Sequence, residues 1–150
     1  ILLGWIGLQN SLVGLGLVLA MFQLPFGLFM MRSSFEALPR ELEEAALIDG
    51  CTPGSALWRV LLRGVLPGIV TVAIFSFLLS WTDYVFAFVL VSSDSLKTLP
   101  VGLASILGSF DARWGELMAG ATLITLPLLI MFSLLSRYFI QGLAAGAVKG

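Results

Sequence analysis

Three long stretches of this 150-residue chain contain no charged residue: 1–31, 64–82 and 117–136. Each is at least 19 residues long, and about 20 apolar residues in a helix cross the hydrocarbon core of a bilayer. The composition agrees, because only 11% of the residues are charged, against about 25% in ordinary soluble domains. The mean hydropathy is +1.04. The sequence therefore predicts an all-α membrane protein, a polytopic bundle of transmembrane helices.

Composition also excludes several classes of function. Eight Lys and Arg residues balance nine Asp and Glu residues, so no basic block is available to bind nucleic acid. The sequence has no histidine, and Cys51 is its only cysteine, which argues against a disulfide framework, a Cys/His metal site or a catalytic triad. It lacks the G-x-x-x-x-G-K-[ST] phosphate-binding loop. We therefore expect a protein that is not an enzyme and that carries neither a metal nor a cofactor.

Three membrane spans are expected, at about 11–31, 64–91 and 117–139. Pro25 and Pro127 lie inside the first and the third. A proline inside a helix bends it, and we interpret both bends as packing features rather than moving hinges. The chain begins inside hydrophobic sequence, without an initiator Met or the features of a signal peptide. We therefore expect it to be the C-terminal part of a longer protein.

The basic residues predict the orientation in the membrane. They lie between the first two spans (Arg32, Arg40, Arg59, Arg63), after the third (Arg137, Lys149) and between the last two (Lys97, Arg113). Cytoplasmic loops are enriched in Lys and Arg. The distribution predicts a cytoplasmic loop at 32–63, an external loop at 92–116 and a cytoplasmic tail at 140–150.

The cytoplasmic loop contains the start and stop signals of two short helices. A proline at or near the first helical position, in Leu38-Pro39-Arg40-Glu41, opens the first helix, and Gly50 after Asp49 ends it. Thr52 can cap a second helix that begins at Pro53. The predicted elbow could rest on lipid headgroups or bind a protein. Its glutamate-rich first turn favours a protein, because an anionic leaflet attracts Lys and Arg.

At this loop the sequence resembles a known family. Glu44-Ala45-Ala46-Leu47-Ile48-Asp49-Gly50 is similar to the EAA loop in the membrane subunits of bacterial ABC importers. Further similarities to carbohydrate permeases lie at Leu38–Glu43, Ser80-Trp81-Thr82-Asp83, Lys97-Thr98-Leu99-Pro100-Val101-Gly102-Leu103, Arg137–Leu143 and Ala145–Gly150. The pattern resembles most the second permease subunit of maltose-type importers, which usually has six spans; this chain corresponds to the last three. It departs from the family at Arg63, where a proline is common, whereas Pro67 matches.

The resemblance implies a permease subunit of an ATP-driven sugar importer in the bacterial plasma (inner) membrane. The implied partners are an ATPase subunit dimer, which alone binds ATP, a second permease subunit, an external solute-binding protein, the lipid bilayer and the sugar. The expected contact with the ATPase consists of Glu44, Ala45, Ala46, Asp49 and Gly50. In that contact the acids would accept hydrogen bonds from basic groups, the alanines would permit close approach and the glycine would turn the chain.

Polar and aromatic residues form two neighbouring stripes on the second span. Ser76, Ser80, Asp83 and Ala87 are spaced i, i+4, i+7 and i+11, and Phe77, Trp81, Tyr84 and Phe88 follow the same spacing beside them. We expect Ser76, Ser80, Trp81, Asp83 and Tyr84 to line the path of the sugar. Hydrogen bonds to the partner subunit and lipid-facing aromatic rings remain alternatives. Gln23 of the first span is expected to form an interhelical hydrogen bond.

Two other functions remain open. The chain could belong to a secondary carrier that is driven by ions through Asp83, because an ionisable residue inside a membrane is costly and often functional. It could also be a membrane anchor subunit that transports nothing.

Overall fold

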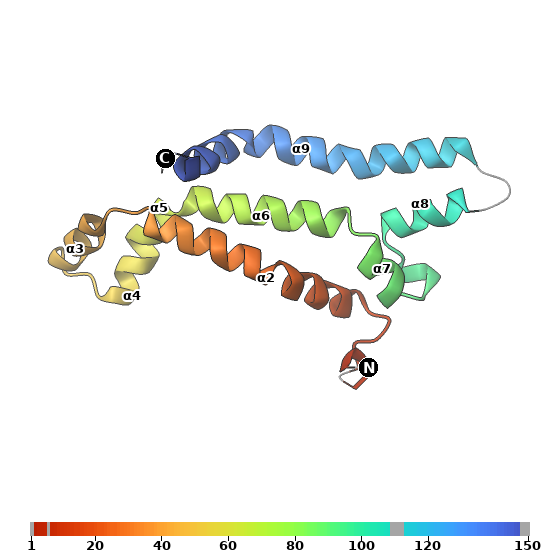
Figure 1. The fold of residues 1–150 in the computed structure, drawn as a ribbon, viewed down its shortest axis with the longest axis horizontal. Coiled ribbons are helices and arrows are strands. Elements are labelled where there is room, and N and C mark those ends of the chain that lie inside the picture. Colours follow the sequence, from red (N-terminus) through yellow and green to blue (C-terminus); the bar gives the residue numbers. More distant parts are fainter. Residues whose placement is uncertain (1, 6, 109–112, 148–150) are drawn as a thin grey trace. The chain divides into compact units, whose positions relative to one another are not determined.

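A computed structural model describes residues 2–5, 7–108 and 113–147, with side chains described at 4–5, 7–108 and 113–133. Within these ranges all regular structure is helical (Figure 1). In chain order the elements are α1 (Leu2–Trp5), α2 (Leu12–Glu36), α3 (Arg40–Ile48), α4 (Pro53–Ala56), the π-helix η1 (Leu57–Leu61), α5 (Leu62–Gly64), α6 (Leu66–Trp81), α7 (Val85–Leu90), the 3-10 helix η2 (Asp94–Leu96), α8 (Leu99–Leu107) and α9 (Trp114–Ala147). The prediction of an all-α fold is confirmed.

The number of candidate membrane spans also fits the prediction. Leu12–Glu36 and Trp114–Ser133 are each long and apolar enough to cross a bilayer. Pro53–Gly64 and α6 pass the same test as a pair, with a bend of 70° between them. The described part of the chain therefore contains two candidate spans, or three if the bent pair counts as one.

The chain divides into two compact units. Unit 1 comprises Ile1–Gln23 and Ser76–Ser133, and unit 2 comprises Leu24–Phe75 and Leu134–Gly150. Helices α2, α6 and α9 each contribute to both units.

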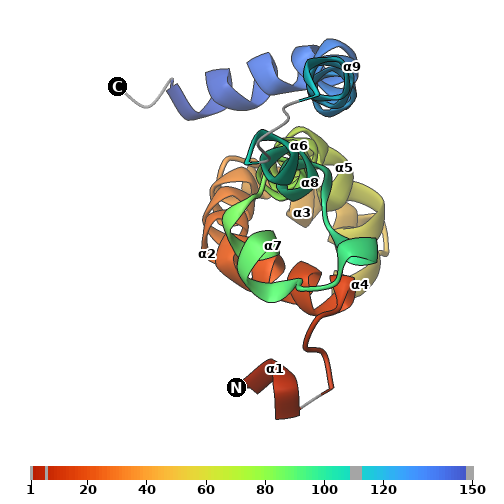
Figure 2. The same cartoon turned by 90° about the vertical axis from the view of Figure 1, so that its right-hand side faces the viewer.

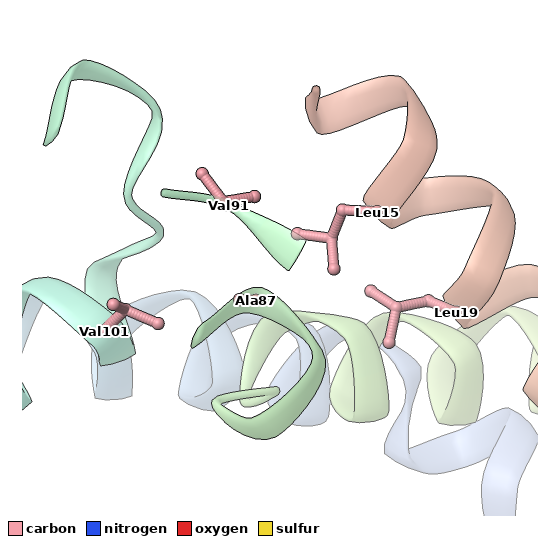
Figure 3. Packing of buried hydrophobic residues seen from close by; sticks show 5 residues of the cluster. All are labelled: Leu15, Leu19, Ala87, Val91 and Val101. Carbon is pink, nitrogen blue, oxygen red and sulfur yellow. The ribbon is translucent and has the colours of Figure 1, made fainter. Parts of the chain in front are cut away.

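The buried core of unit 1 joins α2 to the helices that follow α6. Leu15 and Leu19 of α2 pack with Ala87 of α7, with Val91 just after α7, and with Val101 of α8 (Figure 3). All five are at most 9% exposed. The segment after α6 is therefore folded back against α2 and is not an open loop.

The second predicted span is not one continuous helix. Helix α6 ends at Trp81, and a separate helix, α7, begins at Val85 (Figure 2). The cause is local: the Asp83 carboxylate accepts hydrogen bonds from the backbone N–H groups of Phe86 (3.5 Å) and Ala87 (2.9 Å). Asp side chains compete in this way with the helical ladder and favour helix starts. The expected continuous helix over 64–91 is therefore wrong.

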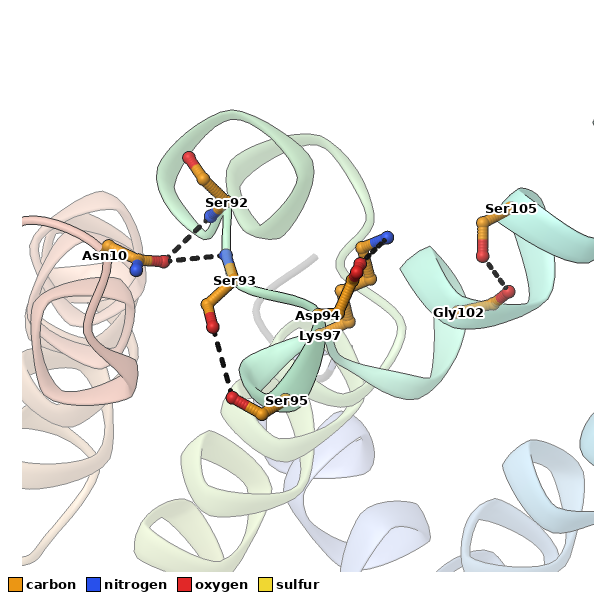
Figure 4. Close-up of polar contacts among 8 residues, drawn as sticks. All are labelled: Asn10, Ser92, Ser93, Asp94, Ser95, Lys97, Gly102 and Ser105. Atoms are coloured by element: carbon orange, nitrogen blue, oxygen red, sulfur yellow. Dashed lines mark hydrogen bonds and ion pairs between the residues drawn. The ribbon is translucent and has the colours of Figure 1, made fainter.

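A second polar contact fixes the turn after α7. Asn10 Oδ1 accepts hydrogen bonds from the N–H groups of Ser92 (2.9 Å) and Ser93 (3.0 Å), as Figure 4 shows. Asn10 has a φ of 53°, in the left-handed region that asparagine tolerates better than most residues. One amide group thus joins the residues before α2 to the end of α7.

The first and third spans extend beyond their predicted boundaries, and the predicted loop between the second and third contains a helix. Helix α2 continues beyond Met31 to Glu36, where Glu36 Oε1 lies 2.7 Å from Arg32 Nε, one helical turn away. Helix α9 begins at Trp114, before the predicted start of the third span. The stretch 92–116, expected as a loop, contains α8 with Thr98 as its N-cap residue and a proline in its first turn.

In unit 2, α2 and α6 approach closely at small residues. A Cβ atom added at Gly68 would overlap Ser34 Oγ, and Ser34 Cβ would lie only 2.7 Å away. The Ser34 hydroxyl donates a hydrogen bond to the Met30 carbonyl at 2.8 Å, so it is not free to turn aside without losing that bond. On the same two helices, the rings of Phe26 and Phe75 also pack together, with centroids 5.3 Å apart. Small residues commonly permit such close packing between membrane helices.

This contact predicts that a single methyl group at Gly68 destabilises the protein. Gly68→Ala should lower the melting temperature of the purified protein, because overpacking a tight contact costs about 1–3 kcal/mol. The matched control is Gly16→Ala, also inside a helix but with nothing within 4 Å of the added Cβ. It should leave the melting temperature unchanged or raise it, since Ala favours helix more than Gly does. Equal melting temperatures for the two variants would contradict the contact.

Candidate coupling loop and translocation path

The turn at Gly50 ends α3 with two backbone hydrogen bonds. The Gly50 N–H donates to the Leu47 carbonyl at 3.1 Å, and the Cys51 N–H donates to the Ala46 carbonyl at 3.0 Å. This pattern is a Schellman motif, in which the residue after the C-cap adopts a left-handed conformation. Gly50 supplies it with a φ of +84°. The predicted stop at Gly50 is confirmed.

The second helix of the loop starts as the sequence predicts. The Thr52 hydroxyl accepts a hydrogen bond from the Ser55 N–H at 3.4 Å, and Pro53 occupies the first turn. Helix α4 passes into the π-helix η1 and then α5, before the chain bends at Val65, which is only 2% exposed. Pro67, two residues further on, has no N–H to donate to the preceding turn. The exposed Arg63 lies just before this bend.

The predicted contact residues of the loop divide between its surface and its interior. Glu44, Ala45, Asp49 and Gly50 are exposed, whereas Ala46 is only 5% exposed. Helix α3 contacts α4 and η1, and the small side chain of Ala46 lies on its buried side. The expectation that Ala46 permits the approach of a partner is corrected: the structure uses this residue for packing within the loop. Glu44 and Asp49 form no ion pair with any described residue.

Two large apolar side chains on this loop were not predicted as site residues. Ile48 is 84% exposed, and Trp58 is 74% exposed. Their exposure could not be read from the pattern, because it depends on how α3 packs against α4 and η1. The side chains stand on a loop that also presents exposed carboxylates, and this combination is typical of a protein contact surface.

In unit 1, Ser80 forms an interhelical contact. Gln23 Nε2 donates a hydrogen bond to Ser80 Oγ at 3.0 Å, joining α2 to α6. Gln23 is 9% exposed. The expectation of an interhelical hydrogen bond at Gln23 is confirmed, and its partner is a residue that we expected to line the path.

Trp81 links α6 to α9. Its indole Nε1 donates to the Ile124 carbonyl at 3.0 Å, and its ring stacks on Phe77 with centroids 5.5 Å apart and an interplanar angle of 17°. The acceptor carbonyl lies in the turn that precedes Pro127, where the proline interrupts the helical hydrogen-bond ladder. Trp81 therefore packs against the predicted bend in the third span.

The remaining predicted path residues do not form the expected stripes. Asp83 is half-buried, and both of its carboxylate oxygens accept hydrogen bonds from α7. Tyr84 is 39% exposed and stacks on Phe88, with centroids 5.5 Å apart. Because the helix breaks between Trp81 and Val85, the spacing from Ser76 through Asp83 does not define one helical face. The prediction that these residues form two stripes on one helix is therefore wrong.

A cavity of about 280 Å³ gathers Ser80 and Trp81 with the segment between α7 and α8. It is also lined by Leu12, Ser95, Leu96, Lys97, Thr98, Leu99 and Pro100. Lys97 Nζ lies 2.6 Å from Asp94 Oδ1 (Figure 4). The hydrogen bond and charge of Lys97 lower the pKa of the exposed Asp94 carboxyl from its ordinary value. Among the described residues, no group of three or more His, Cys, Asp or Glu side chains could hold a metal ion.

Comparison with known proteins identifies the family. Residues 1–145 match the family described as binding-protein-dependent transport system inner membrane component. The chain belongs to this family. The resemblance carried by the EAA loop is thus confirmed.

Curated relatives of this permease family include sugar permeases. The diacetylchitobiose uptake system permease protein DasC of Streptomyces coelicolor is 40% identical over 141 residues, which cover 94% of this chain and 51% of that protein. The trehalose transport system permease protein SugB of Mycobacterium tuberculosis is 37% identical over 147 residues (97% and 54%). The trehalose/maltose transport system permease protein MalG of Thermococcus litoralis is 34% identical over 149 residues (99% and 52%). The chain spans about half the length of the curated relatives it matches.

The capping geometry of Asp83 predicts that its oxygen atoms matter more than its charge. Asp83→Asn should keep solute uptake and stability close to those of the unchanged protein, because its single amide oxygen can still accept the shorter bond, from the Ala87 N–H at 2.9 Å, and Asn caps helices about as well as Asp. Asp83→Ala should destabilise the start of α7 by about 0.5–2 kcal/mol and reduce uptake with it. Uptake assays on cells that carry either full-length variant, with melting temperatures of the purified proteins, check this. Equal loss of uptake in both variants, with normal stability, would instead assign the function to the charge.

Proposed function

We propose that this chain is the C-terminal half of a permease subunit that carries a sugar through the membrane in an ATP-driven importer. Loop 32–63 and tail 140–150 face the cytoplasm, and 92–116 faces outward. The loop binds one subunit of a separate ATPase dimer, which holds the ATP. A second permease subunit completes the path, and an external binding protein delivers the solute. The named cargoes of related permeases, diacetylchitobiose, trehalose and maltose, support a sugar.

The observation that carries this proposal is the structured, exposed elbow of the loop. A connection between two membrane helices needs only about 2–8 residues, whereas this one holds two helices joined by a Schellman turn and a threonine cap. Its exposed surface carries Ile48 and Trp58 together with the carboxylates of Glu44 and Asp49. A basic and apolar cleft on an ATPase subunit would satisfy both kinds of group. Binding that favours one of two arrangements of the helices would couple ATP to transport.

An ion-driven carrier is less well supported. Its natural coupling group is Asp83, but that carboxylate already accepts two backbone hydrogen bonds and stabilises the start of α7. A membrane anchor without transport activity would not need an elbow with an exposed apolar surface.

The proposal predicts that the conformation of Gly50 is required for coupling. Gly50→Pro should abolish uptake while the protein still inserts, because proline cannot adopt φ near +84° and removes the hydrogen bond to Leu47. Gly50→Asn is the matched control and should retain much of the uptake, since Asn tolerates the left-handed region. The measurement is uptake and ATP hydrolysis in proteoliposomes that hold the complete transporter. Full uptake by the Gly50→Pro variant would contradict the coupling role.

Ile48 provides a second test that affects association more than folding. Because its side chain is 84% exposed, Ile48→Ser should leave the melting temperature of the permease unchanged. It should weaken co-purification of the ATPase subunit, since an apolar anchor at the centre of an interface often contributes about 2 kcal/mol or more. The control is Leu123→Ser, which alters an exposed leucine of α9 (58% exposed) in a predicted membrane span. Unchanged ATPase binding by the Ile48 variant would show that the elbow binds its partner elsewhere.

A further inference from the structure

The cavity at the external end of unit 1 brings together aromatic, hydroxyl and cationic groups. Ser80 and Trp81 come from the end of α6, and Ser95, Lys97 and Thr98 come from the segment between α7 and α8. Asn10 fixes Ser92 and Ser93 just before the second of these segments (Figure 4), and the core around Val91 and Val101 packs that segment against α2 (Figure 3).

Trp81 offers ring surface to this cavity rather than a hydrogen-bond donor. Its indole N–H is already bonded to the Ile124 carbonyl at 3.0 Å, and one part of its ring stacks on Phe77. The other lining groups include two serine hydroxyls and the Lys97 ammonium, which together can donate and accept hydrogen bonds. A mostly apolar wall with a few polar groups is the usual composition of a site for a small organic molecule.

Thr98 adds a polar group with no partner. Its Oγ1 is buried and has no hydrogen-bond partner among the described residues. Although Thr98 is the N-cap residue of α8, its side chain makes no capping hydrogen bond. A buried hydroxyl without a partner is unfavourable by about 1–3 kcal/mol. Because Thr98 also lines the cavity, rotation about χ1 would let the hydroxyl bond a molecule held there.

We propose that this cavity is a sugar subsite that holds one pyranose ring at the outer end of the translocation path. The inference rests on the proposed function, and it deepens it by naming the residues that would receive the cargo. The apolar face of the ring would lie on Trp81, and its hydroxyls would bond Ser80, Lys97 and Thr98. The volume of about 280 Å³ is just below the range of small-molecule sites, which begins at about 300 Å³, and suits one ring better than a whole oligosaccharide.

The same groups argue against a lipid chain as the occupant. An acyl chain in the cavity would place hydrocarbon against the Lys97 ammonium and the hydroxyls of Ser95 and Thr98. Burying polar groups without hydrogen bonds is unfavourable, whereas a sugar supplies a partner for each of them.

Cysteine protection tests occupancy without requiring transport. Ser95→Cys is introduced into the full-length permease, otherwise free of cysteine (Cys51→Ser included), in the complete transporter. Free trehalose, maltose and diacetylchitobiose at millimolar concentration should each be tried as protectants against a membrane-impermeant maleimide, with and without ATP. The matched control is Ser105→Cys, an exposed serine of α8 that does not line the cavity. At least one sugar should slow labelling at position 95 and leave position 105 unaffected. Equal rates with and without every sugar would overturn the proposal.

Thr98→Val tests the hydroxyl itself in the same assay. The variant should keep or raise the melting temperature, because it removes a hydroxyl without a partner. It should raise the sugar concentration for half-protection about two- to tenfold, the equivalent of one neutral hydrogen bond. Thr122→Val is the control, since that hydroxyl donates to the Met118 carbonyl of its own helix at 2.8 Å and does not line the cavity. Unchanged protection in the Thr98 variant would show that the Thr98 hydroxyl does not bind the sugar.

The two proposals can fail separately. If Gly50→Pro uncouples ATP hydrolysis from uptake but no sugar protects position 95, only the subsite is refuted. If sugars protect position 95 but uptake is independent of the loop, the coupling function is refuted and the binding site stands.

Discussion

Every backbone N–H and C=O group that lies in hydrocarbon must find its hydrogen-bond partner within the protein, because lipid offers none. A continuous helix meets this requirement without help, so the positions where helices stop require side chains with special roles. Between α6 and α7 the partner is Asp83, which accepts two N–H groups of the next helix. After α7 the chain leaves the predicted span, and Asn10 accepts two further N–H groups, those of Ser92 and Ser93, at an exposed position. At each of these two places, one side chain accepts hydrogen bonds from two backbone N–H groups, which in a continuous helix would donate to backbone carbonyl groups.

The same requirement explains the polar residues that face other helices. Gln23 and Ser80 bond each other, and the Trp81 indole bonds a carbonyl near Pro127. Interhelical hydrogen bonds inside membranes contribute about 0.6 kcal/mol on average, so neither contact dominates the stability. Their larger effect is on position: they hold the end of α6 against α2 and α9, and thereby place Ser80 and Trp81 at the wall of the cavity. A polar residue in a membrane span can thus fix the geometry of a site and also line it.

How far the sequence predicts this structure depends on the range of each interaction. The charge-free runs, the stop at Gly50 and the cap at Thr52 act over a few residues, and all were predicted correctly. Asp83 also acts locally, but an acid inside an apolar run is compatible with a helical stripe as well as with a helix start, so the sequence pattern does not predict the start of α7. The Asn10 contact joins residues more than 80 positions apart, and no pattern in one sequence indicates it. The exposure of Ile48 and the burial of Ala46 likewise depend on packing between helices.

If the elbow transmits motion as proposed, opening it must cost more free energy than the coupling free energy that it transmits. Allosteric coupling between two sites is typically about 1–3 kcal/mol. The Schellman turn contributes two backbone hydrogen bonds, each about 0.5–1.5 kcal/mol, and a threonine cap contributes about 1 kcal/mol more. The free energy needed to open the turn at Gly50 is therefore comparable to or larger than the coupling free energy to be transmitted. The π-helix η1 and the bend at Val65 lie on the other side of the cap, and π-helical turns are rarer and often occur at functional sites. The π-helix η1 and the bend at Val65 are thus the places between the Gly50 turn and α6 where the chain departs from regular α-helical geometry.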